Sequence, residues 1–124
     1  MWKGRRESFR NAFRGLWYTI RTQPNAQIHL VVSAIMITFG MFVGLTFTEW
    51  CLAFAAVALV LGAEGLNTAI EALTDLVSPD YHRLAGIAKD TAAGGVLVCA
   101  ICAAIIGVMI FGPHVWRIVS AWLY

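Results

Sequence analysis

The first clear pattern in the chain lies at residues 5–22, where apolar side chains recur at helical spacing. They stand at i, i+3, i+4, i+7, i+8 and i+11, while the arginines fall largely off this stripe. The pattern predicts an amphipathic helix in the membrane interface, with basic side chains at the headgroups and aromatic rings at the acyl boundary. The alternative is a helix packed on a soluble partner. The stripe consists of Phe9, Ala12, Phe13, Leu16, Trp17 and Ile20.

Three longer apolar runs follow, each long enough to cross a bilayer. We expect them to form transmembrane helices at residues 28–47, 50–77 and 91–111. Pro24 breaks the chain before the first span, Pro79 follows the second, and Gly112-Pro113 is expected to end the third. The second run would extend about 40 Å at 1.5 Å per residue, longer than a hydrocarbon core of about 30 Å. One of its ends must therefore emerge from the membrane.

Small and aromatic residues add detail to the spans. Gly40 and Gly44 have the small-xxx-small spacing that permits close approach of helices. The tail after the third span contains aromatic side chains that suit a membrane–water interface, namely Trp116, Trp122 and Tyr124. These features agree with helices that pack together inside a bilayer.

The composition agrees with an all-α integral membrane protein that forms a single domain over residues 1–124. Hydrophobic residues make up 60% of the chain and charged residues 13%, which leaves too little polar surface to cover a soluble globule of this size. The three cysteines lie in or beside apolar runs and are expected to be small core residues.

The basic residues are distributed very unevenly. Eight of the nine lie at the amino end or in the connection between the second and third spans. Because lysine and arginine favour the cytoplasmic side, we expect the amino terminus and this connection in the cytoplasm and the carboxyl terminus outside. The hydrophobic stripe beside the basic residues favours a lipid surface over nucleic acid as their partner.

Polar side chains interrupt the second span along one helix face. They stand at i, i+3, i+4, i+7 and i+11, and we call them the polar seam: Glu64, Asn67, Thr68, Glu71 and Asp75. A carboxylate in hydrocarbon costs several kcal/mol unless it is paired, protonated or metal-bound, and the spans contain no lysine or arginine to pair with it. The seam is therefore expected to face other helices or a wet cavity.

The seam allows a catalytic and a structural interpretation. A desolvated Glu64 could act as a general base on an alcohol delivered from the bilayer. Alternatively, Glu64 is protonated and hydrogen-bonded across a helix interface to Asn67 or Thr68, and Asp75 is already solvated. Five of the seven acidic residues lie between Glu64 and Asp90, together with His82 and Lys89. Such a cluster suits Mg²⁺ and a polyphosphate, since carboxylates bind Mg²⁺ and a lysine neutralises charge during phosphoryl transfer.

Two motifs resemble one known family in combination. The first is Glu64-x-x-Asn67-Thr68-Ala69-Ile70-Glu71-Ala72, followed by Asp75 and Tyr81-His82, and the second is Ala88-Lys89-Asp90 with the small-residue run Ala92-Ala93-Gly94-Gly95. Together they resemble the bacterial integral membrane lipid kinases, the prokaryotic diacylglycerol kinase and undecaprenol kinase family. The resemblance spans nearly the whole chain and is closer to the undecaprenol kinase branch.

The resemblance implies a homotrimer in the bacterial cytoplasmic (inner) membrane, with active sites shared between subunits. The reaction would transfer the γ-phosphoryl group of Mg-ATP to a lipid alcohol. By position, Glu64 would be the catalytic base, Asn67 would position groups beside it, and Glu71 would hold Mg²⁺ and nucleotide. The nucleotide would also contact Asp80, Tyr81, His82, Lys89, Asp90 and either Arg5 or Arg6, with Lys89 on the phosphates.

One position departs from the family pattern. Gln23 stands where the family usually has a glutamate that shares the metal with Glu71, and an amide oxygen is a weaker Mg²⁺ ligand than a carboxylate. This predicts a looser metal site, a replacement ligand such as Asp75 or Asp90, or reduced activity. The alternatives are accordingly a diacylglycerol kinase, or a catalytically impaired trimer that serves in binding or assembly. A proton or cation conductor fits poorly, because residues 28–47 contain no carboxylate.

Overall fold

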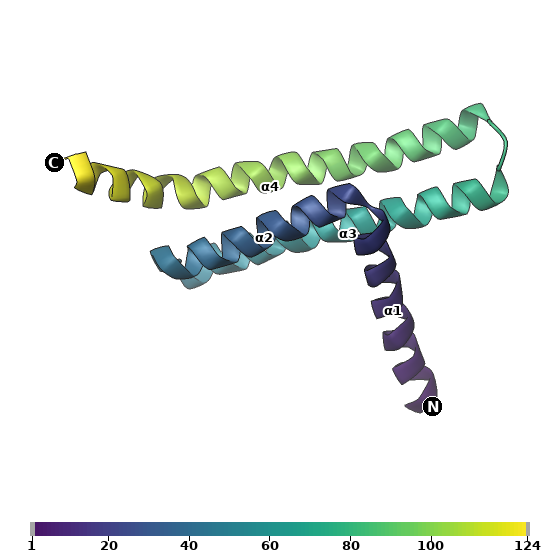
Figure 1. The fold of residues 1–124 in the computed structure, drawn as a ribbon, viewed down its shortest axis with the longest axis horizontal. Helices are drawn as coiled ribbons and strands as arrows, with labels where there is room; N and C mark the ends of the chain where they lie inside the picture. Colours follow the sequence, from purple (N-terminus) through teal and green to yellow (C-terminus); the bar gives the residue numbers. More distant parts are fainter. Residues whose placement is uncertain (1, 124) are drawn as a thin grey trace.

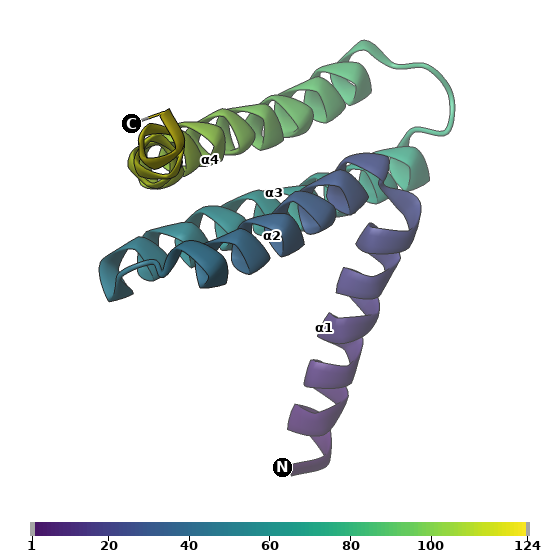
Figure 2. The same ribbon diagram turned by 60° about the vertical axis from the view of Figure 1, so that its left-hand side comes forward.

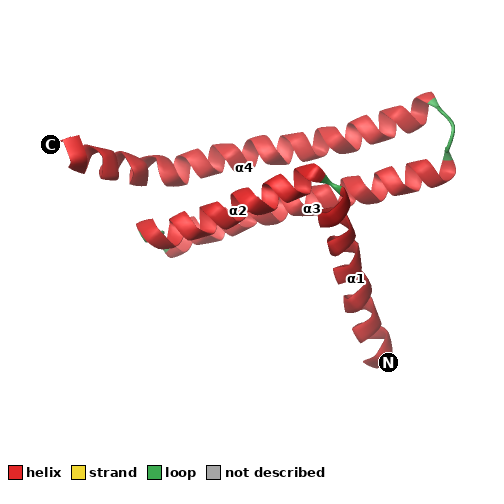
Figure 3. Cartoon of the chain, viewed as in Figure 1, coloured by secondary structure: helices red, strands yellow, loops and turns green. Residues whose placement is uncertain are grey.

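The computed structural model describes residues 2–123 as four helices joined by short connections, without a strand in that range (Figures 1 and 3). Helices α2, α3 and α4 run alongside one another, whereas α1 projects away from them (Figures 1 and 2). Of the four, three are long and apolar enough to cross a membrane. Their bounds are Trp2–Thr22 for α1, Pro24–Val43 for α2, Phe47–Val77 for α3 and Arg83–Leu123 for α4.

The break between α1 and α2 falls at Gln23, as the sequence predicts. Gln23 has extended backbone angles (φ −107°, ψ 109°), and Pro24 occupies the first helical position of α2. A proline is tolerated there because the N–H that it lacks would have no partner inside the helix. The first span therefore begins at Pro24, four residues earlier than expected.

The turn between α2 and α3 corrects the interpretation of the two glycines. Gly44 lies beyond the end of α2 in the left-handed conformation (φ 72°), and its N–H donates to the Gly40 carbonyl at 3.0 Å. A Cβ on Gly40 would lie 2.9 Å from side-chain atoms of both Leu45 and Trp50. Gly44 thus forms a tight turn, and Gly40 leaves room for the side chains of Leu45 and Trp50. The two glycines do not form a continuous small-xxx-small face.

Helix α3 begins at Phe47, three residues before the predicted start. Thr46 caps it: the Thr46 hydroxyl accepts a hydrogen bond from the Glu49 N–H, and the Glu49 carboxylate accepts one from the Thr46 N–H. This reciprocal capping box satisfies two N–H groups that would otherwise lack partners. The segment at residues 46–50 is therefore mostly helix and not a connection. The end of α3 at Val77 agrees with the prediction.

The prediction that the last helix ends at Gly112-Pro113 is wrong. Helix α4 continues through Pro113 to Leu123, so Trp116 and Trp122 lie on a helix rather than in a tail. Tyr124 lies outside the described residues. Proline is tolerated within transmembrane helices where neighbouring groups re-satisfy the backbone. Just beyond it, His114 contacts Glu49 of α3 at 3.0 Å, which secures the extension.

The contact between the three long helices is narrow and apolar. Its buried centre at the α2–α3 turn consists of Leu45, Ala53 and Ile110, with partly buried neighbours that include Trp50 and Phe111. Many other large apolar side chains on α2, α3 and α4 remain exposed in the single chain. Such extensive apolar surface belongs against lipid or against other subunits.

Candidate active site

The polar seam of α3 lies on one helix face and passes from the packed interior to solvent, as its spacing predicts. Glu64 is 1% exposed, and Asn67 and Thr68 are also buried. Glu71 is half-buried, and Asp75 is exposed. Glu64 is the largest fully buried side chain among the described residues, in a chain that leaves most large apolar side chains exposed. Its burial is therefore a feature that needs a chemical reason.

Glu71 accepts hydrogen bonds from two amide side chains. The Gln23 Nε2 donates to Glu71 Oε2 at 2.8 Å, and the Asn67 Nδ2 donates to Glu71 Oε1 at 3.2 Å. Gln23 reaches this position because it stands at the junction of α1 and α2, which packs beside α3. The family resemblance predicts that Gln23 and Glu71 lie next to each other, and their contact confirms this.

Two buried acceptor atoms of the seam lack hydrogen-bond partners among the described residues, namely Glu64 Oε1 and Asn67 Oδ1. The Thr68 hydroxyl donates to the backbone carbonyl of Glu64 and not to its carboxylate. Asn67 uses its amide nitrogen on Glu71. Within one chain, therefore, neither Asn67 nor Thr68 hydrogen-bonds to the Glu64 carboxylate, and the structural interpretation, which places that bond across a helix interface, stays a prediction. Unsatisfied buried acceptors are costly, so a donor is expected to meet them during function.

The sequence interpretation missed His29, which faces Glu64 from α2. Its Nε2 lies 3.6 Å from Glu64 Oε1, and 26% of its side chain is exposed. The separation is beyond a normal hydrogen bond but close enough that a small side-chain rotation would form one. The available signal was a histidine inside an apolar span, where ionisable side chains are rare and usually functional.

Lys89 of α4 contacts Asp75, the last residue of the seam. Its Nζ lies 2.7 Å from Asp75 Oδ1, and both side chains are partly exposed. The contact is short but open to solvent, so the ammonium can exchange one anionic partner for another at modest cost. The neighbouring Asp90 is exposed. The structure thus brings Lys89 to the seam through its ion pair with Asp75. Asp90 directly follows Lys89 in the chain.

The remaining predicted nucleotide contacts lie apart from the seam within one chain. Asp80, Tyr81 and His82 are exposed in the connection between α3 and α4. The His82 Nδ1 accepts a hydrogen bond from the Leu84 N–H at 3.2 Å, which helps to start α4. Arg5 and Arg6 are exposed on α1, whose amino-terminal end points away from α3 and α4 (Figures 1 and 2). One chain does not gather the whole predicted set.

Comparison with known proteins identifies the family. The chain matches the family described as "Prokaryotic diacylglycerol kinase" over residues 10–111. It belongs to this family. It is 42% identical over 107 residues to "Undecaprenol kinase" of Bacillus subtilis (strain 168), covering 86% of this chain and 87% of that protein. It is also 43% identical over 101 residues to "Diacylglycerol kinase" of Synechocystis sp., covering 81% of this chain and 58% of that protein.

A third relative is more distant. "Diacylglycerol kinase" of Haemophilus influenzae is 29% identical over 102 residues, which cover 82% of this chain and 84% of that protein. The family resemblance inferred from the two motifs is confirmed. As a member of the prokaryotic diacylglycerol kinase family, the chain is a phosphotransferase with an alcohol acceptor. The roles of the individual site residues remain predictions.

The donor groups around Glu71 fit a magnesium ion only when nucleotide phosphates supply further ligands. Among the described residues, no three His, Cys, Asp or Glu side chains gather closely enough to enclose a metal. One carboxylate and two amides surround the position, and the amide of Gln23 can turn to present its oxygen. Mg²⁺ commonly uses one or two carboxylates together with substrate phosphates, so this donor set suits Mg-nucleotide.

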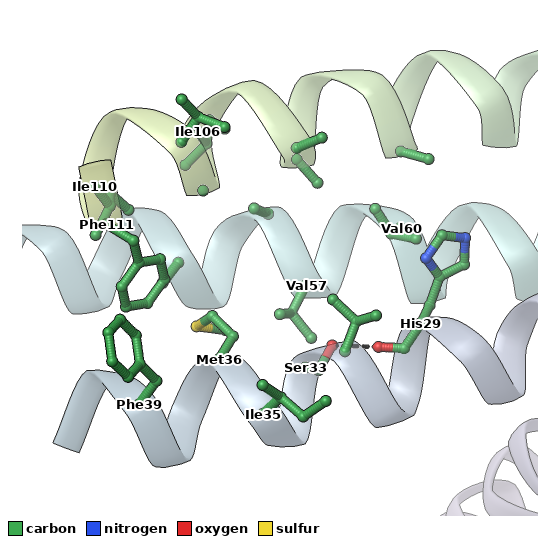
Figure 4. Close-up of a pocket in the computed structure, with 18 of the residues that line it drawn as sticks. His29, Ser33, Ile35, Met36, Phe39, Val57, Val60, Ile106, Ile110 and Phe111 are labelled. Atoms are coloured by element: carbon green, nitrogen blue, oxygen red, sulfur yellow. Dashed lines mark hydrogen bonds between the residues drawn. The ribbon is translucent and has the colours of Figure 1, made fainter. Parts of the chain in front are cut away.

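An apolar groove of about 810 Å³ runs between α2, α3 and α4. Figure 4 shows it reaching from His29 at one end, past Ser33, to Phe39 and Phe111 at the other. Small side chains on the facing walls of α3 and α4, including Ala53 and Gly107, leave this space open. The groove therefore joins an apolar volume to the histidine that faces Glu64.

Proposed function

We propose that this family member transfers the γ-phosphoryl group of ATP to undecaprenol. The observation that carries the proposal is a pair of buried acceptors on one face of α3, Glu64 Oε1 and Asn67 Oδ1, which lack donors among the described residues. A lipid hydroxyl has one proton to donate, and the buried Glu64 carboxylate would receive it. Similarity to a protein named undecaprenol kinase over most of both chains supports a polyprenyl alcohol as the acceptor.

Glu64 acts as the general base in this proposal. It accepts the proton of the lipid hydroxyl while the hydroxyl oxygen bonds to the γ-phosphorus, and the bond from that phosphorus to the bridging oxygen breaks to release ADP. Asn67 positions groups beside Glu64, since its side chain is buried on the same face of α3. Burial suits this role, because water excluded from Glu64 cannot compete for the phosphoryl group.

Lys89 neutralises negative charge on the phosphates after leaving Asp75. Glu71 and Gln23 face one another and would hold Mg²⁺ together with the nucleotide. When bound, the cation offsets charge on the phosphate oxygens as the phosphoryl group moves. Asp80, Tyr81, His82 and Asp90 are exposed near the same end of the helices, where a nucleotide can reach them.

The proposed assembly is a homotrimer with shared active sites in a bacterial cytoplasmic membrane. Exposed apolar surface on the three long helices supports association, and the separation of Arg5 and Arg6 from the seam supports a contribution from a neighbouring subunit. Helix α1 would lie in the interface on its exposed apolar side chains, among them Phe9 and Trp17. The amino terminus and the α3–α4 connection would face the cytoplasm.

The groove provides room for the hydrocarbon part of the acceptor. Its lining is almost wholly apolar, and its His29 end adjoins Glu64. A polyprenyl chain in the groove would present its terminal hydroxyl near the proposed base. Diacylglycerol is the second candidate acceptor, favoured by the similarity to proteins named diacylglycerol kinase.

A third candidate is a trimer with impaired catalysis. It is favoured by Gln23, whose amide nitrogen occupies a Glu71 oxygen that a metal would otherwise use. This candidate predicts nucleotide binding without transfer to any lipid.

The decisive experiment uses purified protein in lipid vesicles with labelled ATP, Mg²⁺ and a panel of lipid alcohols. Labelled undecaprenyl phosphate as the preferred product would support the proposal, and preferred labelling of diacylglycerol would replace its acceptor. No labelled lipid, with nucleotide binding retained, would favour the impaired trimer. The Glu64→Gln variant controls for kinase carried through purification.

A further inference from the structure

His29 is the one side chain on α2 or α3 that can carry a positive charge, because neither helix contains lysine or arginine. It faces the most deeply buried carboxylate of the described residues, with 3.6 Å between His29 Nε2 and Glu64 Oε1. An ionised carboxylate away from water needs a donor or a cation. His29 is placed to provide one.

The surroundings of His29 leave its ring room to turn towards Glu64. The His29 side chain lines the apolar groove (Figure 4). The side chain of His29 is 26% exposed, whereas that of Glu64 is 2% exposed. Ser33, one turn further along α2, donates its hydroxyl proton to the His29 backbone carbonyl at 2.7 Å. The Ser33 hydroxyl therefore does not donate to the His29 imidazole. Rotation of the ring would carry Nε2–H into hydrogen-bond range of Glu64 without moving either helix.

We propose that His29 is a positioning residue for Glu64, a role that rests on the proposed lipid kinase function. The His29 Nε2–H donates to one carboxylate oxygen, which orients the other oxygen towards the acceptor hydroxyl. Both the neutral Nε2–H tautomer and the protonated ring can donate in this way. The lipid proton passes to the oriented oxygen of Glu64, while His29 keeps its own proton throughout the transfer.

Two substitutions separate donation from simple space filling. His29→Gln retains a side-chain N–H donor at similar reach, whereas His29→Leu retains only apolar volume. We expect His29→Leu to lower kcat about 10- to 100-fold, the range for losing a hydrogen bond to a charged group, while KM for Mg-ATP stays constant. His29→Gln should recover most of kcat. Thr38→Val is the matched control on the same helix, since the Thr38 hydroxyl donates to the Ala34 carbonyl and Thr38 is not part of the groove lining, and it should leave kcat unchanged.

An equal loss of kcat in both His29 variants, or a loss that appears in KM for Mg-ATP instead, would overturn the positioning role. So would normal turnover in His29→Leu. Thermal unfolding of each variant in vesicles identifies misfolded protein, and His29→Gln keeps the test valid if His29→Leu misfolds.

A measurement without turnover tests the pairing itself. The imidazole ¹⁵N resonances of His29, assigned by their loss in His29→Gln, are compared between the wild-type protein and Glu64→Gln. The proposal expects the Nε2 resonance to shift when the carboxylate is removed, while those of His82 and His114 stay in place. An unmoved resonance would overturn the pairing. If the protein transfers phosphate to no lipid, the proposed function fails, and this measurement still decides whether His29 bonds to Glu64.

Discussion

Helix α3 carries two glutamates that face histidines, one near its start and one near its middle, and the two pairs differ in how fully the carboxylate is bonded. At the α2–α3 turn, Glu49 accepts hydrogen bonds from the Thr46 backbone and hydroxyl and contacts His114 at 3.0 Å. In the seam, Glu64 stands 3.6 Å from His29 with one oxygen unpartnered among the described residues. Both oxygens of the Glu49 carboxylate have partners, and its contact with His114 joins α3 to α4. The Glu64 carboxylate is buried and left open to bond something else.

This difference separates structural from chemical use of the same side-chain pair. A carboxylate whose two oxygens both have partners stabilises a helix start and is less available to a substrate. A buried and under-bonded carboxylate is unfavourable for stability and is typically found at functional sites, where a ligand completes its bonding. The comparison therefore predicts that substitutions at the two glutamates have opposite consequences for stability and turnover.

The largest effect is expected for Glu64→Gln. The amide keeps the shape of the side chain but cannot accept a proton, so transfer to the lipid should fall by at least about 10²- to 10⁴-fold, the usual contribution of a general base. Assembly, measured by size-exclusion chromatography in detergent, should be unchanged. Glu49→Gln is the matched control and should retain turnover. Near-normal activity in Glu64→Gln would remove this residue from the base role.

The next largest effect is expected for Lys89→Met, which keeps the apolar stem and removes the ammonium. Transfer should fall more than lipid binding, because the charge acts on the phosphates. Asp75→Asn is the control, since it breaks the same 2.7 Å ion pair while leaving the ammonium in place. Loss of lipid binding equal to the loss of turnover would instead indicate that Lys89 serves the packing of α4. A large loss in Asp75→Asn would point to Asp75 as a metal ligand.

A smaller effect, confined to the magnesium requirement, is expected at Gln23 and Glu71. Gln23→Glu places a second carboxylate beside Glu71, where the present amide donates at 2.8 Å, and should lower the Mg²⁺ concentration needed for half-maximal turnover by several-fold. Glu71→Gln should raise that concentration. The combined variant decides whether the two positions share a metal. If the gain from Gln23→Glu survives unchanged without the Glu71 carboxylate, the two positions do not share one.

How much the sequence could predict depended on how far apart along the chain the interacting residues lie. The polar seam follows from residues three and four apart on one helix, so its common face and its passage from interior to surface could be predicted. The break at Gln23 and the end of α3 near Pro79 are equally local. The opposition of Gln23 and Glu71 came from the family resemblance rather than from periodicity.

The errors arose where a distant contact decided the outcome. Pro113 was expected to end a helix, but α4 continues, and just beyond the proline His114 contacts Glu49 of another helix. His29 was overlooked because its significance depends on Glu64, which meets it only after α2 packs on α3. Neither contact has a signature in local spacing. Arg5 and Arg6 lie on α1, which projects away from the other helices, and the proposal that they serve the site of a neighbouring subunit has no local pattern behind it.

The smallest effect on turnover is expected for Thr46→Ala, which changes the surroundings of the Glu49–His114 pair. This change removes the hydroxyl that accepts from the Glu49 N–H and donates to its carboxylate, and so weakens the start of α3. Loss of such a cap costs about 0.5–2 kcal/mol of stability, so thermal unfolding in vesicles should occur at a lower temperature. Turnover per folded protein should be unchanged, because the α2–α3 turn lies at the opposite end of α3 from Asp75 and Lys89. Thr46→Ser retains the hydroxyl and serves as the control for the lost methyl group. If Thr46→Ala instead lowered turnover while unfolding at the wild-type temperature, the Glu49–His114 contact would belong to the catalytic machinery, and the distinction between the two glutamates would fail.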